Sequence, residues 1–267
     1  MKSPFKTLGF LPVLVLLACG PHADPIPVAA QTGDFTISLA GKPVGTANYH
    51  LTPSGSGYNS TSLVRINMKG LTYAFSKNEQ LSGASQLQHV ELSATVNDSA
   101  VNVTGAPDSA QFLLNMSANG RSSTTRLAKQ PGAVFLPDFD PGAFQTLLNL
   151  GRATNNRDLY VIIPKNQGSI VPVELATYAD EQGTLNGQTV TVHHLVATIS
   201  GSLTDLFAGQ DNQLLQAELP QEGFAIIRNG FVLKPPAKPL APPAPPPGVQ
   251  QQQPGAQQQP AQAPAAN

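Results

Sequence analysis

The segment Asp34–Leu51, DFTISLAGKPVGTANYHL, decides the fold class. Apolar residues take every second position on both sides of a Gly- and Pro-containing centre, Gly41–Gly45: Phe35, Ile37, Leu39, Ala47, Tyr49 and Leu51. A period of two is that of strands with one buried and one exposed face. The segment is therefore predicted to form two antiparallel strands joined by a turn at Gly41–Gly45.

The same alternation recurs along the chain. Further strand faces are predicted for Val64, Ile66 and Met68; for Leu71, Tyr73 and Phe75; and for Phe112, Leu114, Met116 and Ala118. Three Asn-Gly pairs, at 119–120, 186–187 and 229–230, predict tight hairpins because both residues tolerate positive φ. Two shorter apolar runs, 159–163 and 171–175, also read as strands, which Pro164 and Pro172 restrict to strand ends or sheet edges.

One segment departs from this pattern. Asp140 is a helix N-cap candidate, and Pro141 suits the first helical position. Apolar residues then recur at helical spacing, and Gly151 is expected to end the helix. The predicted fold is mainly β: an antiparallel curved sheet or open barrel, with this one short helix plugging one end. The β-rich domain spans residues 33–234, either as one unit or as two halves joined near residues 137–157.

The N-terminus reads as an export signal, residues 1–19. Lys2 and Lys6 precede the apolar run Leu8–Leu17, which is too short to span a bilayer. The sequence Leu16-Leu17-Ala18-Cys19 resembles a bacterial lipobox, which implies acylation of Cys19. The resemblance predicts a lipid-anchored protein on the periplasmic face of a bacterial envelope, with residues 20–32 as a tether. The alternative is cleavage after Ala23 or Ala30, which would remove Cys19 and leave a secreted protein.

Composition excludes several classes of function. Charged residues make up 12% of the chain, with net charge −1 and no basic stripe, so a nucleic-acid partner is not expected. Cys19 is the single cysteine, which excludes a Cys-based zinc or thiol site in the domain. Residues 235–267 are dominated by Pro, Gln and Ala, and they predict a disordered tail that serves as a spacer or docking arm, or has no specific partner.

Few residues suggest catalytic chemistry. His193 and His194 are adjacent on a predicted strand, so one should face inward beside Val190 and Val192 and the other should face water. Asp138 and Asp140 would point the same way on an extended chain, but Asp140 is better explained as the helix cap. Signatures of a nucleophile elbow, a phosphate loop, a dinucleotide site or a zinc protease do not occur. No catalytic residue, metal or cofactor is predicted.

Three stretches resemble a family of bacterial periplasmic and envelope proteins known mainly as a domain of unknown function. They are Gly41–Tyr49; the helix ending Leu147-Leu148 with the strand after it; and Leu185–Gln188 followed by Leu214–Pro220 and the closing segment Arg228–Leu233. The resemblance implies a curved antiparallel sheet or open barrel and transfers no catalytic residue. The family often has a Trp in its penultimate strand, whereas this chain has no Trp.

These features favour a non-enzymatic envelope lipoprotein. Its domain is expected to bind or shield an amphiphilic or carbohydrate-like ligand, or an envelope partner. One alternative is a periplasmic hydrolase or metal enzyme that uses His193 or His194 with a carboxylate such as Asp138. Another is a structural or assembly protein acting through its tail. Inward-facing Tyr, Phe and Leu residues could line an apolar cavity, although a solid core is the default for such residues.

Overall fold

The computed structural model describes residues 29–235 and consists mainly of β-strands with one α-helix. The elements in chain order are β1 (Gln31–Leu39), β2 (Lys42–Ser54), β3 (Gly57–Met68), β4 (Leu71–Ser82), β5 (Leu87–Val96), β6 (Ser99–Asp108), β7 (Gln111–Ala118), β8 (Arg121–Ala128), β9 (Ala133–Phe135), α1 (Pro141–Thr154), β10 (Leu159–Ile163), the 3-10 turn η1 (Lys165–Gln167), β11 (Ser169–Thr177), β12 (Glu181–Leu185), β13 (Gln188–Ile199), β14 (Ser202–Ala208), β15 (Leu214–Leu219), β16 (Phe224–Arg228) and β17 (Phe231–Leu233). The predicted signal, Cys19, most of the tether and nearly all of the tail lie outside the described residues.

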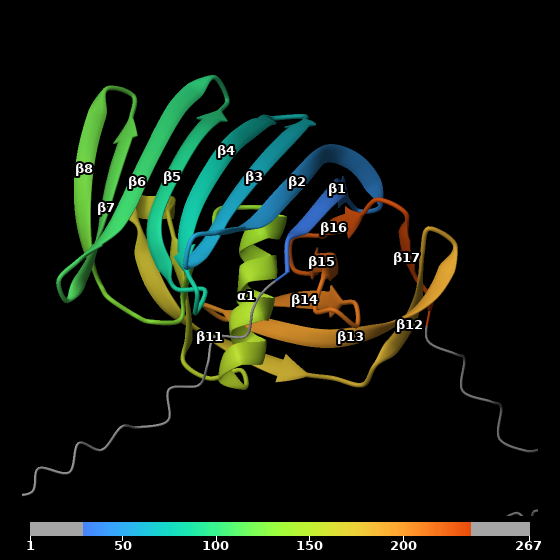
Figure 1. Cartoon of the computed structure of the whole chain (residues 1–267). Coiled ribbons are helices and arrows are strands. Elements are labelled where there is room, and N and C mark those ends of the chain that lie inside the picture. The colour runs from blue at the N-terminus through green and yellow to red at the C-terminus, as the bar shows by residue number, and fades with distance from the viewer. Residues whose placement is uncertain (1–28, 236–267) are drawn as a thin grey trace, which may run out of the picture. The chain divides into compact units, whose positions relative to one another are not determined.

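The strands form a mostly antiparallel sheet that curves around the helix. Strands β8 to β1 pair in reverse chain order, and β1 then pairs with β16 through Phe35–Arg228 and Leu39–Phe224. The order continues through β15, β14, β13, β11 and β10, where β9 joins in parallel. Among residues 29–235 no ladder joins β8 to β9, so the sheet stays open. Figure 1 shows α1 within the curve.

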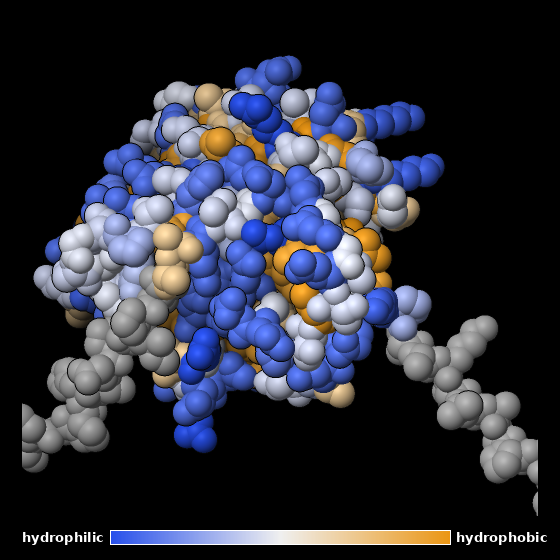
Figure 2. All heavy atoms as spheres, turned by 45° about the vertical axis from the view of Figure 1, so that its right-hand side comes forward, coloured by the Kyte–Doolittle hydropathy of each residue, from blue (hydrophilic) through white to orange (hydrophobic). Residues whose placement is uncertain are grey.

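A small second sheet branches from β13. Residues 188–192 of that strand pair with β12, which pairs in turn with β17. Val192, Phe207, Leu215 and Phe231 form a separate apolar cluster beneath it. Figure 2, which brings this side forward, shows hydrophobic side chains reaching a largely hydrophilic surface, and Val232 is 61% exposed.

The predicted mainly β, open and curved architecture is confirmed in detail at several positions. Asn119-Gly120 and Asn186-Gly187 have positive φ at both residues and join β7 to β8 and β12 to β13. Asp140 caps α1, and its side chain accepts a hydrogen bond from the Gly142 amide. None of the helices among residues 29–235 is long and apolar enough to cross a membrane.

Four boundary predictions are wrong. Asn229-Gly230 is a corner and not a hairpin, because β17 pairs with β12 in the second sheet. Helix α1 continues past Gly151 to Thr154, and Asn155 ends it in the left-handed region, φ 52°. The first turn is Ala40-Gly41, since Lys42 already pairs with Leu39. The tether ends earlier than predicted: the strand begins at Gln31, which pairs with Leu51.

Candidate functional site

Helix α1 begins in close contact with the concave face of the sheet. A side-chain carbon at Gly142, the second helical residue, would lie 2.3 Å from Ser62 Oγ and 3.1 Å from Tyr49 Cβ. Only glycine therefore fits at this position without a shift of strands β2 and β3. The close approach sets the height of the helix above the sheet and carries its N-cap, Asp140, into the interior, where it is 0% exposed.

Three charged side chains meet at this end of the helix. Lys77 and Glu79 lie on the inward face of β4, in phase with Phe75 and Leu81. The Nζ atom of Lys77 lies 2.9 Å from Glu79 Oε2 and 2.5 Å from Asp140 Oδ2. None of the three side chains is more than 1% exposed. One buried cation thus faces two buried carboxyl groups, an arrangement that costs desolvation energy and needs tight pairing to persist.

Burial alters the protonation of this cluster. It raises the pKa of Glu79 to about 7, because attraction to Lys77 offsets only part of the desolvation and Asp140 adds repulsion. Burial alone would lower the pKa of Lys77, but the Asp140 and Glu79 carboxylates raise it above its ordinary value. At neutral pH and below, the proton that Glu79 retains lets the cluster approach electrical neutrality.

A buried amide fixes the middle of the helix. Gln145 Oε1 accepts hydrogen bonds from Tyr49 Oη at 2.9 Å and from the Leu214 amide at 2.8 Å. Its Nε2 donates to Asn212 O at 2.8 Å and to Asn149 Oδ1 at 3.1 Å. All the hydrogen-bonding capacity of this side chain is used. Gln145 therefore holds together α1, β2 and the loop before β15.

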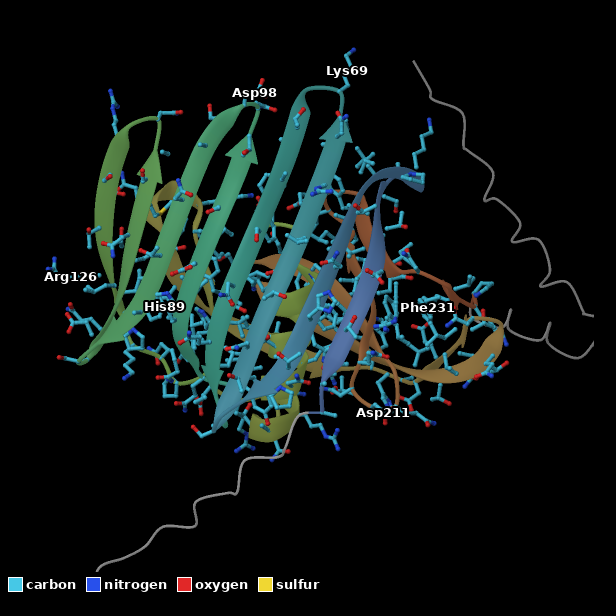
Figure 3. All side chains as sticks on the ribbon, turned by 45° about the horizontal axis from the view of Figure 1, so that its top comes forward. Lys69, His89, Asp98, Arg126, Asp211 and Phe231 are labelled. Atoms are coloured by element: carbon cyan, nitrogen blue, oxygen red, sulfur yellow. The ribbon has the colours of Figure 1, made fainter. Side chains whose placement is uncertain are left out.

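The C-terminal end of α1 borders a groove of about 850 Å³. Its walls come from five separate parts of the chain: 29–31, 83–86, 130–132, 149–160 and 211–213. Six amide side chains line it: Gln31, Gln86, Gln130, Asn149, Asn212 and Gln213. Figure 3 shows Asp211, on the groove wall, at the opposite end of the sheet from Lys69 and Asp98.

The remaining lining of the groove is mixed. Arg152 supplies one positive charge, and Asp158 and Asp211 supply two negative charges. Of the lining residues between positions 29 and 235, Tyr160 is the one aromatic residue. A smaller cavity of about 50 Å³ adjoins the groove, shares Gln86, Gln130 and Pro131 with it, and includes residues of β8, β9 and β10 in its lining. The groove therefore has polar groups on all sides and little net charge.

The two predicted histidines point in different directions, as adjacent residues on a strand should. His193 is partly exposed, with Nδ1 2.9 Å from Asp180 Oδ1. His194 is on the face of Val192, stacks on Phe207 with ring centroids 4.6 Å apart, and is 17% exposed. Neither histidine lines the groove or the smaller cavity.

Both ring nitrogens of His194 already have carboxylate partners. Nδ1 lies 3.1 Å from Glu181 Oε1, and Nε2 lies 2.8 Å from Asp205 Oδ1. The two carboxylates approach opposite edges of the ring and cannot share one metal ion with it. Within residues 29–235 no group of three or more His, Cys, Asp or Glu side chains is arranged to hold a metal.

The Asp138–Asp140 pair does not act as a unit. Phe139 has φ 61°, so the chain is not extended there, and the two carboxylates diverge. Asp138 forms an exposed ion pair with Lys165 at 2.9 Å, whereas Asp140 is the buried cap. Asp138 also does not pair with His193 or His194. The carboxylate partners of these histidines are Asp180, Glu181 and Asp205.

Sequence reasoning missed Lys77 and Glu79, although the sequence carried a signal for them. Both occupy the same alternating positions as Tyr73 and Phe75, which face inward. A strand with one buried face therefore places these two charges in the interior. Their partner Asp140 lies more than sixty positions away, and no local pattern links the two. The groove had no sequence signal, because it is assembled from five separated segments.

Comparison with known proteins supports the fold alone. No protein-family model and no curated protein matches the sequence. Among solved structures, the chain is similar to a β-barrel-like protein of a domain of unknown function, DUF1849, from Brucella abortus. The TM-score is 0.52 at 8% identity, and the match covers 79% of this chain and all of the other. The likeness shows a bacterial β-rich fold shared with a domain whose function is unknown.

Proposed function

We propose that this chain is an exported envelope lipoprotein whose domain binds a neutral, hydroxyl-rich ligand, such as a short glycan, in the groove at the end of α1. The groove itself is the observation that carries the proposal. Its volume of about 850 Å³ lies within the roughly 300–1,000 Å³ that is usual for ligand sites.

The lining favours a carbohydrate-like ligand over an amphiphile or an ion. An amide side chain carries both donors and an acceptor, which suits hydroxyl groups, and six of them line the groove. The charges of Arg152, Asp158 and Asp211 largely cancel, so a strongly charged ligand gains little. Tyr160 provides a flat apolar surface of the kind on which a sugar ring can rest. The apolar residues are mostly small, and an acyl chain would need a longer continuous apolar wall.

Part of the groove is held in place before any ligand arrives. Asn149 Oδ1 accepts from Gln145 Nε2 and from Asn212 Nδ2, at 3.1 and 3.2 Å. Gln145 is in turn fixed by Tyr49 and Leu214. Side chains that are already ordered lose little conformational freedom on binding, which favours affinity.

We also propose that binding is not followed by catalysis. A histidine that acts as a general base needs a ring nitrogen free to accept a proton from the substrate. Both nitrogens of His194 face carboxylates, and neither His193 nor His194 reaches the groove. These contacts favour a structural role for His194 over the hydrolase alternative.

Anchoring through an acylated Cys19 would hold the groove near a membrane surface. Ala29, on the groove wall, is ten positions after Cys19. An extended chain covers at most about 3.5 Å per residue, so the groove would lie within about 35 Å of the acylated cysteine. Ligands at the membrane surface, such as envelope glycans, would be within reach.

Calorimetric titration of the purified full chain with neutral oligosaccharides tests the proposal, with monomeric detergent as the amphiphilic probe. Tyr160→Ala is expected to weaken oligosaccharide binding at least tenfold, or about 1.4 kcal/mol. Tyr178→Ala is the matched control, because Tyr178 is 56% exposed beside His194 and away from the groove. Saturable binding of detergent alone, or equal affinities for the two variants, would contradict a glycan site.

A further inference from the structure

The buried cluster at the start of α1 contains everything that an amide-forming reaction needs, and ligand binding does not use it. An amine, a carboxyl group and a second, proton-holding carboxyl group lie in contact and out of water. We propose that Lys77 and Asp140 become joined by a spontaneous isopeptide bond, with Glu79 as the proton carrier. The chain would thereby acquire a covalent crosslink between strand β4 and the N-cap of helix α1.

The reaction is balanced without any other reagent. The neutral amine of Lys77 attacks Cγ of the protonated Asp140 carboxyl, and a carbon–nitrogen bond forms. The Cγ–Oδ2 bond breaks, and Oδ2 departs as water. One amine proton stays on the new amide nitrogen. The other passes through Glu79 to the departing oxygen, which already holds the carboxyl proton. Nothing is oxidised or reduced.

Burial lowers the usual obstacle to this reaction. In water, a lysine is protonated and an aspartate is ionised, so neither the nucleophile nor the electrophile is available. Lys77, Glu79 and Asp140 are at most 1% exposed, and charges lose much of their solvation there. Burial favours a proton shift from the ammonium to the carboxylate, because the shift leaves a neutral pair, whereas the attraction between Lys77 and the two carboxylates opposes it. The Nζ–Oδ2 contact of 2.5 Å holds the reactants together, which replaces a bimolecular encounter.

The helix N-terminus can stabilise the intermediate. Attack at Cγ drives negative charge onto Asp140 Oδ1, which accepts a hydrogen bond from the Gly142 amide at 2.9 Å. A backbone donor at the positive end of a helix dipole is a suitable oxyanion partner in a water-free site. The second helical residue, Gly142, thus both permits the close approach of the helix and supplies this donor.

Glu79 is placed to move the proton. Its Oε2 lies 2.9 Å from Lys77 Nζ. Burial raises the pKa of Glu79 to about 7, so this carboxyl can both accept and return a proton near neutral pH. The two carboxyl groups therefore have different roles: Asp140 is the electrophile, and Glu79 carries the proton.

The chain contains a matched control for the effect of burial. Lys165 Nζ lies 2.9 Å from Oδ2 of Asp138, the residue two positions before Asp140. The side chains of this ion pair are 62% and 41% exposed. The same two residue types are in contact there with water present and with no third carboxyl group in the pair. Lys165 is therefore expected to remain unmodified in the molecules in which Lys77 is linked.

Peptide mapping by mass spectrometry of the purified full chain tests the proposal. The expected result is a branched pair of peptides, one carrying Lys77 and the other Asp140, lighter than their sum by one water. In Asp140→Asn, which keeps an N-cap side chain, the linked pair should be lighter by one ammonia instead. Glu79→Gln should leave the peptides separate, with circular dichroism confirming that this variant folds.

Separate, unmodified Lys77 and Asp140 peptides from the folded natural chain would overturn the proposal. A linked pair in folded Glu79→Gln would overturn the role of Glu79. Neither result bears on the groove, which lies at the other end of the helix, so the crosslink and the glycan site can fail independently.

Discussion

Replacing Gln145 with Leu should destabilise the domain more than any other single change to the polar contacts of α1. The substitution keeps the side chain close to its natural size but removes four hydrogen bonds. Tyr49 Oη and the Leu214 amide lose the acceptor that both share. Asn149 Oδ1 keeps a donor, Asn212 Nδ2, at 3.2 Å.

The magnitude follows from the groups left without partners. A buried donor without a partner costs about 1–3 kcal/mol. Two such donors, the Tyr49 hydroxyl and the Leu214 amide, give a loss of about 2–6 kcal/mol in the free energy of unfolding. For a domain of this size, 1 kcal/mol corresponds to roughly 2–4 °C. The melting temperature should therefore fall by about 4–24 °C.

Thermal and urea unfolding of Gln145→Leu, Tyr49→Phe and the double variant measure this effect. Tyr49→Phe removes a single hydrogen bond and should cost about 0.5–1.5 kcal/mol. The double variant should be less destabilised than the sum of the two, because the orphaned hydroxyl is gone. A Gln145→Leu protein within about 0.5 kcal/mol of the natural chain, the range typical of surface changes, would refute the proposed role of Gln145.

Three further predictions concern the cluster and the anchor. Gly142→Ala should destabilise the domain by about 1–3 kcal/mol, because the new methyl overlaps Ser62 Oγ, and Ser62→Ala in the same chain should restore part of the loss in urea unfolding. Glu79 has a folded pKa of about 7 against its ordinary 4.5, so its contribution to stability is complete below about pH 4.5 and is lost as pH rises to 7. That loss is about 3 kcal/mol, and Glu79→Gln should flatten the stability–pH curve over this interval; parallel curves for the two proteins would contradict the shift. Cys19→Ser should release the protein into the soluble fraction or leave it as uncleaved precursor, and a processed, membrane-bound mutant in cell fractionation would exclude acylation of Cys19.

Much of the local structure could be predicted because its causes are local. Alternation at Phe35 and Ile37 reports burial on one strand face, and Asn119-Gly120 reports a turn with two positive φ angles. Asp140 marks the start of the helix because its side chain accepts a hydrogen bond from the nearby Gly142 amide. Each of these signals depends on residues within a few positions of one another.

Long-range structure was not predictable in the same way. The pairing of Phe35 with Arg228 joins two strands from opposite ends of the domain sequence, and no pattern in either strand identifies its partner. Helix α1 ends at Asn155, which adopts the left-handed conformation. The sequence instead favoured Gly151, four positions earlier, as the end of the helix. The same limit applies to the candidate site, because the groove exists only after five distant segments meet.

Mapping amide chemical shifts by NMR during oligosaccharide titration tests groove binding most directly. Saturable changes are expected at residues 83–86, 130–132 and 211–213, three segments that are distant in sequence but share the groove. The strand carrying His193 and His194 should be unaffected. Shifts confined to the histidine strand, or no saturable shift with any oligosaccharide, would contradict ligand binding in the groove.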